Sequence, residues 1–207
     1  MEIRIEERFP VTETELHRYG TVPIAFAVTA RFVPSRIDGG LGGLRLTEAS
    51  VEPPYVKDYD AMPGEGPHAW ASHFDLSGWT LFLALCETGP VGGAALAENK
   101  VGLELLSPRP DAALLYDLRV HPRHRGQGIG RRLFSAAEAR ARERGFRWLE
   151  VETQNTNVPA CRFYVAMGCV LRMIREDAYP DVPDEAQMLW GKRLRQETNR
   201  GGVSRVP

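Results

Sequence analysis

The sequence predicts a mixed α/β fold, in which helices flank a central sheet. Apolar runs of strand length recur through the second half of the chain, and two segments with the period of amphipathic helices, residues 129–144 and 159–167, lie between them. Gly145 and Gly168 follow these two segments and would end the helices. Strands that alternate with helices need crossover connections, which distinguishes this fold from a helical bundle or a two-sheet sandwich.

The first half of the chain predicts fewer regular elements. Residues 1–8 alternate charged and apolar side chains, which is typical of a strand and unlike a secretion signal. Strands are expected at residues 24–33 and 44–51, with the glycine-rich loop 37–43 between them. A short helix is expected around residues 68–74, inside an irregular connection that contains several prolines and aromatics.

The second half predicts a continuous series of strands and helices. Apolar runs at residues 79–87 and 91–98 flank the turn residues 88–90, which predicts a hairpin. The elements expected after the hairpin are, in chain order, a strand at 111–120, a helix at 129–144, a strand at 147–153, a helix at 159–167 and strands at 170–176 and 187–193. A β-meander followed by alternating helices and strands indicates a sheet with both antiparallel neighbours and crossovers.

Length and charge limit the number of domains and the kinds of partner. The chain has 207 residues, of which 43% are hydrophobic, so one domain with a substantial core is expected. We expect a β-rich extension at residues 1–51, the main domain at 52–195 with its clearest motifs at 79–193, and a flexible tail at 196–207. The formal net charge of −1 argues against a nucleic-acid partner, and no apolar run approaches the roughly 20 residues that cross a membrane.

The three cysteines, Cys86, Cys161 and Cys169, are an odd and sparse set without the spacing of a metal site. Free thiols in a reducing compartment are the simplest interpretation, so we expect a cytoplasmic protein without a bound metal. A homodimer is the expected assembly if the protein forms one, because twofold dimers are the commonest oligomers.

The junction at residues 117–130 is the most informative stretch of the sequence. A strand ends there, a short basic turn follows, and Gly126, Gly128 and Gly130 open an amphipathic helix. A helix N-terminus favours an anion, and glycine lets the backbone approach a phosphate because it has no Cβ. Five cationic or titratable side chains surround this point: Arg123, His124, Arg125, Arg131 and Arg132. The junction therefore predicts a diphosphate site.

Two other phosphate motifs fit the junction poorly. A P-loop needs Lys and then Ser or Thr after its last glycine, whereas Arg131 and Arg132 follow Gly130. A dinucleotide fingerprint that begins at Gly126 would need a glycine at position 131, although Glu150 lies at about the right distance for its ribose-binding acid. The plain structural alternative is a glycine-rich helix cap among solvated arginines.

The pattern Arg125-x-x-Gly128-x-Gly130, after a strand that ends Leu-Arg-Val, resembles the acetyl-CoA signature of the GNAT acetyltransferase superfamily. The resemblance implies a mixed, mostly antiparallel sheet that splays at the signature strand, with acetyl-CoA as co-substrate. It implies that backbone groups around Leu118, Arg119 and Val120 bind the pantetheine arm. The pyrophosphate would be held by the loop residues Arg125, Gly126, Gln127, Gly128, Ile129, Gly130 and Arg131.

A second motif agrees with the first. Asn157, Ala160, Tyr164 and Gly168 resemble the family pattern Asn-x-x-Ala-x-x-x-Tyr-x-x-x-Gly-Phe, with Cys169 in place of the phenylalanine. Singly, the asparagine would be an ordinary N-cap and the tyrosine an ordinary helix residue. Their position one strand after the glycine loop favours the family, and implies that both contact the coenzyme.

A narrower resemblance is to the streptothricin acetyltransferases. It is carried by residues 152–161 and by the later stretch from Tyr179 to residue 190. The motifs cover residues 79–193, whereas the first 50 residues show no match, so this resemblance leaves the acceptor specificity open.

The chemistry that the resemblance implies is attack of an amine on a thioester. A lysine-like amine has a pKa of about 10.4, so deprotonating it at pH 7 costs roughly 4 to 5 kcal/mol and calls for a base. Glu152 leads because the resembling ribosomal-protein acetyltransferases carry their base five residues before the residue equivalent to Asn157. Glu150, which lies on the same strand face, and Asp117 are the other two candidates for the base. Tyr164 would protonate the departing thiolate.

An acidic and aromatic set of side chains suits a cationic acceptor. Its members are Asp58, Tyr59, Asp60, Trp70, Asp75, Tyr179, Asp181, Asp184 and Glu185. We expect Tyr179 and Asp117 to bind the substrate. Three functions stay open: an acetyltransferase for a small cationic amine, a protein or peptide N-acetyltransferase, and a non-catalytic acetyl-CoA-binding module. A closed acidic pocket would favour the first, and an open trench the second.

Overall fold

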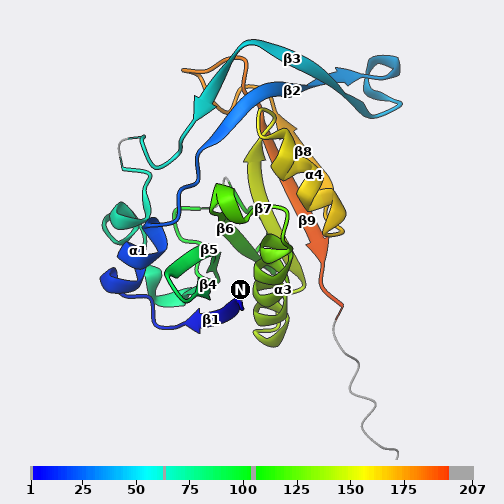
Figure 1. Ribbon diagram of the computed structural model, residues 1–207. Helices are drawn as coiled ribbons and strands as arrows, with labels where there is room; N and C mark the ends of the chain where they lie inside the picture. The colour runs from blue at the N-terminus through cyan, green and yellow to red at the C-terminus, as the bar shows by residue number, and fades with distance from the viewer. Residues whose placement is uncertain (1, 63, 104–105, 196–207) are drawn as a thin grey trace, which may run out of the picture.

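The computed structural model describes residues 2–62, 64–103 and 106–195, and it has the mixed α/β architecture that the sequence predicts (Figure 1). A seven-stranded sheet with the order β1-β4-β5-β6-β7-β9-β8 forms the body, and β2 pairs with β3 in a separate sheet. Among the described strands of the larger sheet, β6 and β7 are parallel and the other neighbours are antiparallel. The strands are β1 (Arg4–Arg8), β2 (Phe26–Arg36), β3 (Leu44–Lys57), β4 (Trp79–Cys86), β5 (Gly89–Ala97), β6 (Ala112–Val120), β7 (Trp148–Gln154), β8 (Val170–Arg175) and β9 (Gln187–Arg193).

Helices cover both faces of the seven-stranded sheet. On one face, Leu133 of α3 and Cys161 of α4 belong to the same buried apolar cluster. On the other face, Tyr19 of α1 and Trp70 of α2 belong to a second cluster. The helices are α1 (Glu13–Gly20), α2 (Trp70–His73), α3 (Ile129–Glu143) and α4 (Val158–Ala166), with 3-10 turns η1 (Asp38–Gly40), η2 (Pro67–Ala69), η3 (Leu76–Gly78) and η4 (Pro122–His124). None of the helices in the described part of the chain is long and apolar enough to cross a bilayer.

The predicted elements of the second half are confirmed to within a residue or two, including the hairpin of β4 and β5 and both amphipathic helices. The short helix expected around residues 68–74 is α2. In contrast, α1 was not expected. The Thr12 side chain caps it by accepting a hydrogen bond from the Glu15 amide at 3.3 Å, and its two buried side chains face the sheet.

The strands β2 and β3 form a long two-stranded arm that lies across the upper end of the sheet in Figure 1. Reciprocal bonds attach the arm to the end of β7: the Phe32 amide donates to the Asn155 carbonyl at 3.0 Å, and the Asn155 side chain donates to the Phe32 carbonyl at 2.9 Å. The expected boundary between residues 51 and 52 falls within β3, and β1 joins the main sheet. The tail expected at residues 196–207 lies outside the described residues.

The parallel strands β6 and β7 part after the first three residues of each, as the predicted splayed sheet requires. They pair through only three positions, from Ala112 opposite Trp148 to Leu114 opposite Glu150, although both strands continue beyond these residues. On the other side of β6, a register shift leaves Tyr116 as an extra residue opposite β5. The splay opens a wedge in the sheet beside the N-terminus of α3.

Candidate active site

A cleft of about 1090 Å³ occupies the wedge between β6 and β7. The end of β6, the glycine loop and α4 form one part of its lining, and the arm and residues 179–185 contribute to another. The expected coenzyme residues that line it are Leu118, Arg119, Val120, Arg125, Gly126, Gly128, Ile129, Gly130, Arg131, Asn157 and Tyr164. Gln127 does not line the cleft, and its side-chain amide donates to the Arg123 carbonyl at 3.4 Å.

The glycine loop leaves the first turn of α3 open to the cleft. Gly126 and Gly128 have φ angles of 77° and 79°, in the left-handed region that favours glycine. Gly128 is the N-cap of α3 and has no side chain to accept from the first amides of the helix. No heavy atom lies within 4 Å of where a Cβ would stand at either glycine. Unpaired amides beside open space are the feature that binds a phosphate at a helix N-terminus.

Arg125 fastens this loop to its surroundings. Its Nε donates to the Val120 carbonyl at 3.0 Å, and its Nη2 donates to the Ala25 carbonyl at 3.1 Å. Partial burial lowers the pKa of the Arg125 guanidinium. The side chain therefore joins the end of β6 to the segment that precedes β2. Asn157 has a similar local role, because its Oδ1 accepts from the Ala160 amide at 3.2 Å and so caps α4.

The two predicted catalytic side chains, Glu152 on β7 and Tyr164 on α4, both line the cleft. The Tyr179 hydroxyl donates to Glu152 Oε1 at 2.5 Å. Burial raises the pKa of Glu152 to about 7, and the Tyr179 hydrogen bond opposes this shift. Burial also raises the pKa of the Tyr164 phenol, which keeps it protonated at neutral pH. The pair thus combines a carboxyl that titrates near neutrality with a phenol that can donate a proton.

The other two carboxylates considered as bases are engaged elsewhere. Glu150 is buried, accepts from the Ser107 hydroxyl at 2.7 Å and does not line the cleft. Asp117 lines the cleft, but Arg119 donates to both of its oxygens and Tyr19 donates to Oδ1 at 2.5 Å. Of the three, Glu152 is therefore the one that lines the cleft without an ion-pair partner among the described residues, and burial raises its pKa to about 7.

Five of the nine acceptor-side candidates line the cleft, namely Tyr59, Asp60, Trp70, Tyr179 and Glu185. The other four, Asp58, Asp75, Asp181 and Asp184, do not. Asp75 caps the turn η3, and Asp184 forms an ion pair with Arg31. These roles show why an acidic residue in a loop is a weak indicator of a site.

Sequence reasoning missed Lys57 and Gln154, which help to arrange this end of the cleft. Lys57 forms a largely buried ion pair with Glu185. Gln154 accepts a hydrogen bond from the Tyr59 hydroxyl and donates one to the Tyr179 hydroxyl at 3.2 Å. The partners are far apart in sequence, so no local pattern indicates them.

The charges of the cleft are divided between two regions. Arg125 and Arg131 accompany the glycine loop. Away from that loop, carboxylates outnumber cations in the lining. The carboxylates are Asp60, Glu65, Asp117, Glu152 and Glu185, and the cations are Lys57 and Arg119. The described residues hold no group of His, Cys, Asp or Glu arranged to bind a metal ion. The cleft is suited to an anion at one end and a cation at the other.

Two parallel strands that separate beside a helix, with a glycine loop at the N-terminus of that helix, are characteristic of the N-acetyltransferase class of α/β folds. The chain belongs to the acetyltransferase (GNAT) family, whose family model matches residues 45–169.

Streptothricin acetyltransferases are among its relatives. The protein from Streptomyces lavendulae is 34% identical over 126 residues, which cover 61% of this chain and 62% of the relative. Streptothricin acetyltransferase A from Bacillus subtilis strain 168 is 27% identical over 167 residues, covering 80% of this chain and 87% of the relative. This chain thus spans less than two thirds of the Streptomyces protein.

Solved structures share the fold. A protein of Bacillus anthracis strain Ames, provisionally assigned as a streptothricin acetyltransferase and solved in complex with acetyl coenzyme A, matches with a TM-score of 0.71 and 24% identity. The match covers 94% of this chain and 99% of that one. The fold similarity therefore includes the arm and the N-terminal elements as well as the motif-bearing half.

Proposed function

We propose that this protein is an acetyl-CoA-dependent N-acetyltransferase that acetylates a primary amine of a small cationic molecule by direct attack. The observation that carries the proposal is the continuity of the cleft, in which the open end of α3 and an excess of carboxylates line the same cavity. Family membership supports the reaction, and the relatives named streptothricin acetyltransferases support an amine antibiotic as the acceptor.

Acetyl-CoA would lie along the end of β6. The open amides of the first turn of α3 suit its diphosphate, and the cations of the glycine loop add to the attraction. The backbone around Leu118 to Val120 has no strand partner on the side of the wedge. The Val120 carbonyl already accepts from Arg125, so the remaining backbone groups of this stretch would pair with the amides of the pantetheine arm. An amide near Val120 would stabilise the thioester oxygen as it becomes negative.

The transfer joins the amine nitrogen to the acetyl carbon and breaks the carbon–sulfur bond. Glu152 accepts the proton that the amine loses, and at neutral pH a base with a pKa of about 7 is substantially ionised. Tyr164 would donate a proton to the departing coenzyme A thiolate. Burial raises its pKa, so the phenol is protonated at neutral pH and is a weaker acid than an exposed tyrosine. The excess of carboxylates near Asp60 and Glu185 favours the cationic remainder of the acceptor.

The shape of the site favours a small acceptor over a peptide. The arm contributes Phe26 and Lys57 to the lining, and residues 179–185 contribute Tyr179, Val182 and Glu185. These segments come from outside the wedge and line the acceptor side of the cleft, which supports a small acceptor, whereas a peptide needs an open trench. The presence of both Glu152 and Tyr164 in the cleft argues against a module that only binds acetyl-CoA.

A thiol-release assay with acetyl-CoA tests the proposal. The acceptors would be polyamines, aminoglycosides, streptothricin, amino acids and short peptides, with the Glu152→Gln protein as the matched control. We expect thiol release with small cationic amines and an acetylated amine in the product by mass spectrometry. Release with peptides alone would support the protein acetyltransferase instead, and coenzyme binding without any release would support the binding module. Assembly as a homodimer stays a prediction that sedimentation velocity would test.

A further inference from the structure

Arg119 is the most fully bonded side chain near the cleft. Its guanidinium has five N–H donors, and all five are used. Nε and Nη2 donate to Asp117 at 2.9 and 2.7 Å, Nη1 and Nη2 donate to Asp60 at 2.6 and 3.1 Å, and Nη1 also donates to the Val22 carbonyl at 3.1 Å. Only 1% of this side chain is exposed. With no donor left over, Arg119 is not a phosphate ligand, and its side chain acts within the protein.

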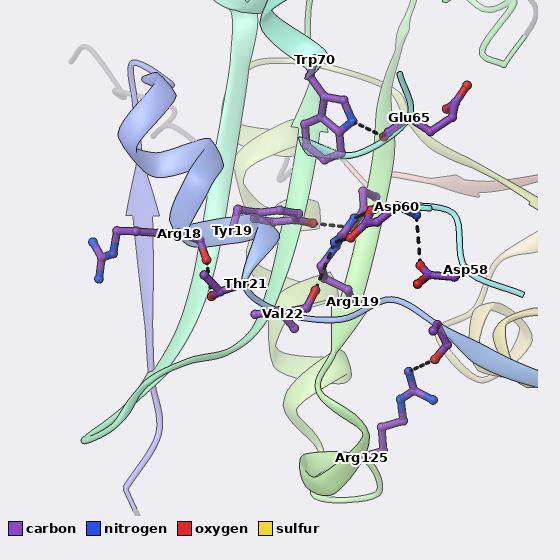
Figure 2. Close-up of polar contacts among 12 residues, drawn as sticks. Arg18, Tyr19, Thr21, Val22, Asp58, Asp60, Glu65, Trp70, Arg119 and Arg125 are labelled. Carbon is purple, nitrogen blue, oxygen red and sulfur yellow. Dashed lines mark hydrogen bonds and ion pairs between the residues drawn. The ribbon is translucent and has the colours of Figure 1, made fainter. Parts of the chain in front are cut away.

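The bonds of Arg119 join four parts of the chain (Figure 2). Arg119 and Asp117 belong to β6, the strand proposed to bind the coenzyme. Tyr19 of α1 donates to Asp117 and lies under the guanidinium, whose carbon is 5.0 Å from the centre of the ring. Val22 lies in the connection from α1 to the arm. Asp60 belongs to residues 58–62, which follow the arm and are called the acceptor loop below.

The acceptor loop forms part of the wall that the amine would meet. Tyr59, Asp60 and Met62 of this loop line the cleft. The loop is held at one point by the bond from the Tyr59 hydroxyl to Gln154 on β7, and at a second by the two bonds between Asp60 and Arg119 on β6. Since β6 and β7 part at the wedge, the loop connects the two separated strands across the cleft.

We propose that Asp60 is a positioning residue, which through Arg119 fixes the acceptor loop relative to β6 and thereby sets where the amine lies against the acetyl-CoA. The inference rests on the proposed function. A bidentate carboxylate–guanidinium pair fixes distance and orientation together, which a single hydrogen bond does not. Because reaction rates depend steeply on the placement of the reacting atoms, a loosened loop would impair acceptor binding and turnover.

The Asp60→Asn substitution tests this role without leaving an unpaired buried charge. Asp117 still neutralises Arg119 in that variant, so the large penalty for breaking a buried ion pair does not apply. The asparagine nitrogen cannot accept from Arg119, so the bidentate geometry is lost. Asp60→Glu keeps the charge and is the rescue variant. Asp181→Asn is the matched control, since Asp181 is exposed and does not line the cleft.

For Asp60→Asn, we expect the KM for the acceptor to rise about tenfold while the Kd for acetyl-CoA in calorimetry changes by less than about twofold. Amide hydrogen exchange should become faster in residues 58–62 and stay unchanged in α3. Asp60→Glu should recover part of the acceptor KM, and Asp181→Asn should match the wild-type protein.

Two results would overturn the inference: an Asp60→Asn protein with unchanged acceptor KM and unchanged exchange, or one in which both ligands weaken equally with a general rise in exchange. A wild-type protein that acetylates no amine would instead refute the proposed function. In that case the exchange measurement still decides whether Asp60 fixes the loop.

Discussion

Replacement of Glu152 by glutamine tests the proposed base and its surroundings together. The glutamine side chain keeps the size of the carboxyl and can accept from Tyr179, but it cannot take a proton from the amine. General-base catalysis contributes about 10²- to 10⁴-fold, so kcat should fall by about that factor. The Kd for acetyl-CoA should stay near the wild-type value, since the expected coenzyme residues lie on β6, the glycine loop and α4 and not on β7.

If Glu152 is the base, its pKa sets how kcat of the wild-type protein depends on pH. Burial raises that pKa to about 7, so the active carboxylate is present above pH 7 and is lost as the pH falls below it. The ionised fraction grows from about one eleventh at pH 6 to about ten elevenths at pH 8, so kcat should rise about tenfold over this range. An unperturbed carboxyl would be ionised throughout and would contribute no change.

The acceptor amine also titrates, and this could produce a similar pH dependence of kcat. The Tyr179→Phe protein distinguishes the two causes, because the acceptor ionises in the same way with this variant as with the wild-type protein. Tyr179 donates to the carboxylate at 2.5 Å and so favours its charged form. A hydrogen bond to a charged group is worth about 1.5 to 3 kcal/mol, so its loss should move the acidic limb of kcat upward by about one to two pH units. A limb that does not move, or full activity in Glu152→Gln, would refute the assignment of Glu152 as the base.

Three further substitutions test the phenol, the glycine loop and the core. Tyr164→Phe keeps the buried ring and removes the hydroxyl, so kcat should fall by about 10²-fold with little change in the Kd for acetyl-CoA; full turnover would exclude Tyr164 as the acid. Gly128→Val places a β-branched residue at a φ of 79° and fills the space before α3, so calorimetry should show acetyl-CoA binding weakened by at least about tenfold. Unchanged binding would contradict a phosphate site there. Gly93→Ala brings a Cβ into steric overlap with the buried Tyr19 ring, which should cost about 1 to 3 kcal/mol of unfolding free energy. An unchanged Tm would show that the ring can move aside.

The parts of the fold that were predicted correctly are those with a strong local pattern. The strands from β4 onward are apolar runs between turn residues, and α3 shows its buried face directly in the spacing of Ile129, Leu133 and Ala137. In contrast, α1 buries only Leu16 and Tyr19, too few apolar positions to show a period. Thr12 and Glu15 have the spacing of a capping box, a signal of a helix start that the prediction did not include.

The site was predictable where a motif places residues on one element, and not where it depends on distant contacts. The glycine loop and Tyr164 were predicted from the spacing of two motifs, and the structure places both against the cleft. The pairing of Lys57 with Glu185 depends on how the arm lies over the sheet, which no local signal specifies. The bond between Asp117 and Arg119 is an intermediate case, since residues two apart in a strand share a face and opposite charges there attract.

The splay between β6 and β7 separates two kinds of molecular recognition. If the acyl donor is held by main-chain groups along β6 and at the start of α3, most substitutions leave that recognition intact, because every residue except proline offers the same amide and carbonyl. The amine, in contrast, would be recognised by the side chains of Tyr59, Tyr179 and Glu185. A single codon change can replace any one of them. A scaffold built in this way can acquire new acceptors by mutation while its donor stays the same.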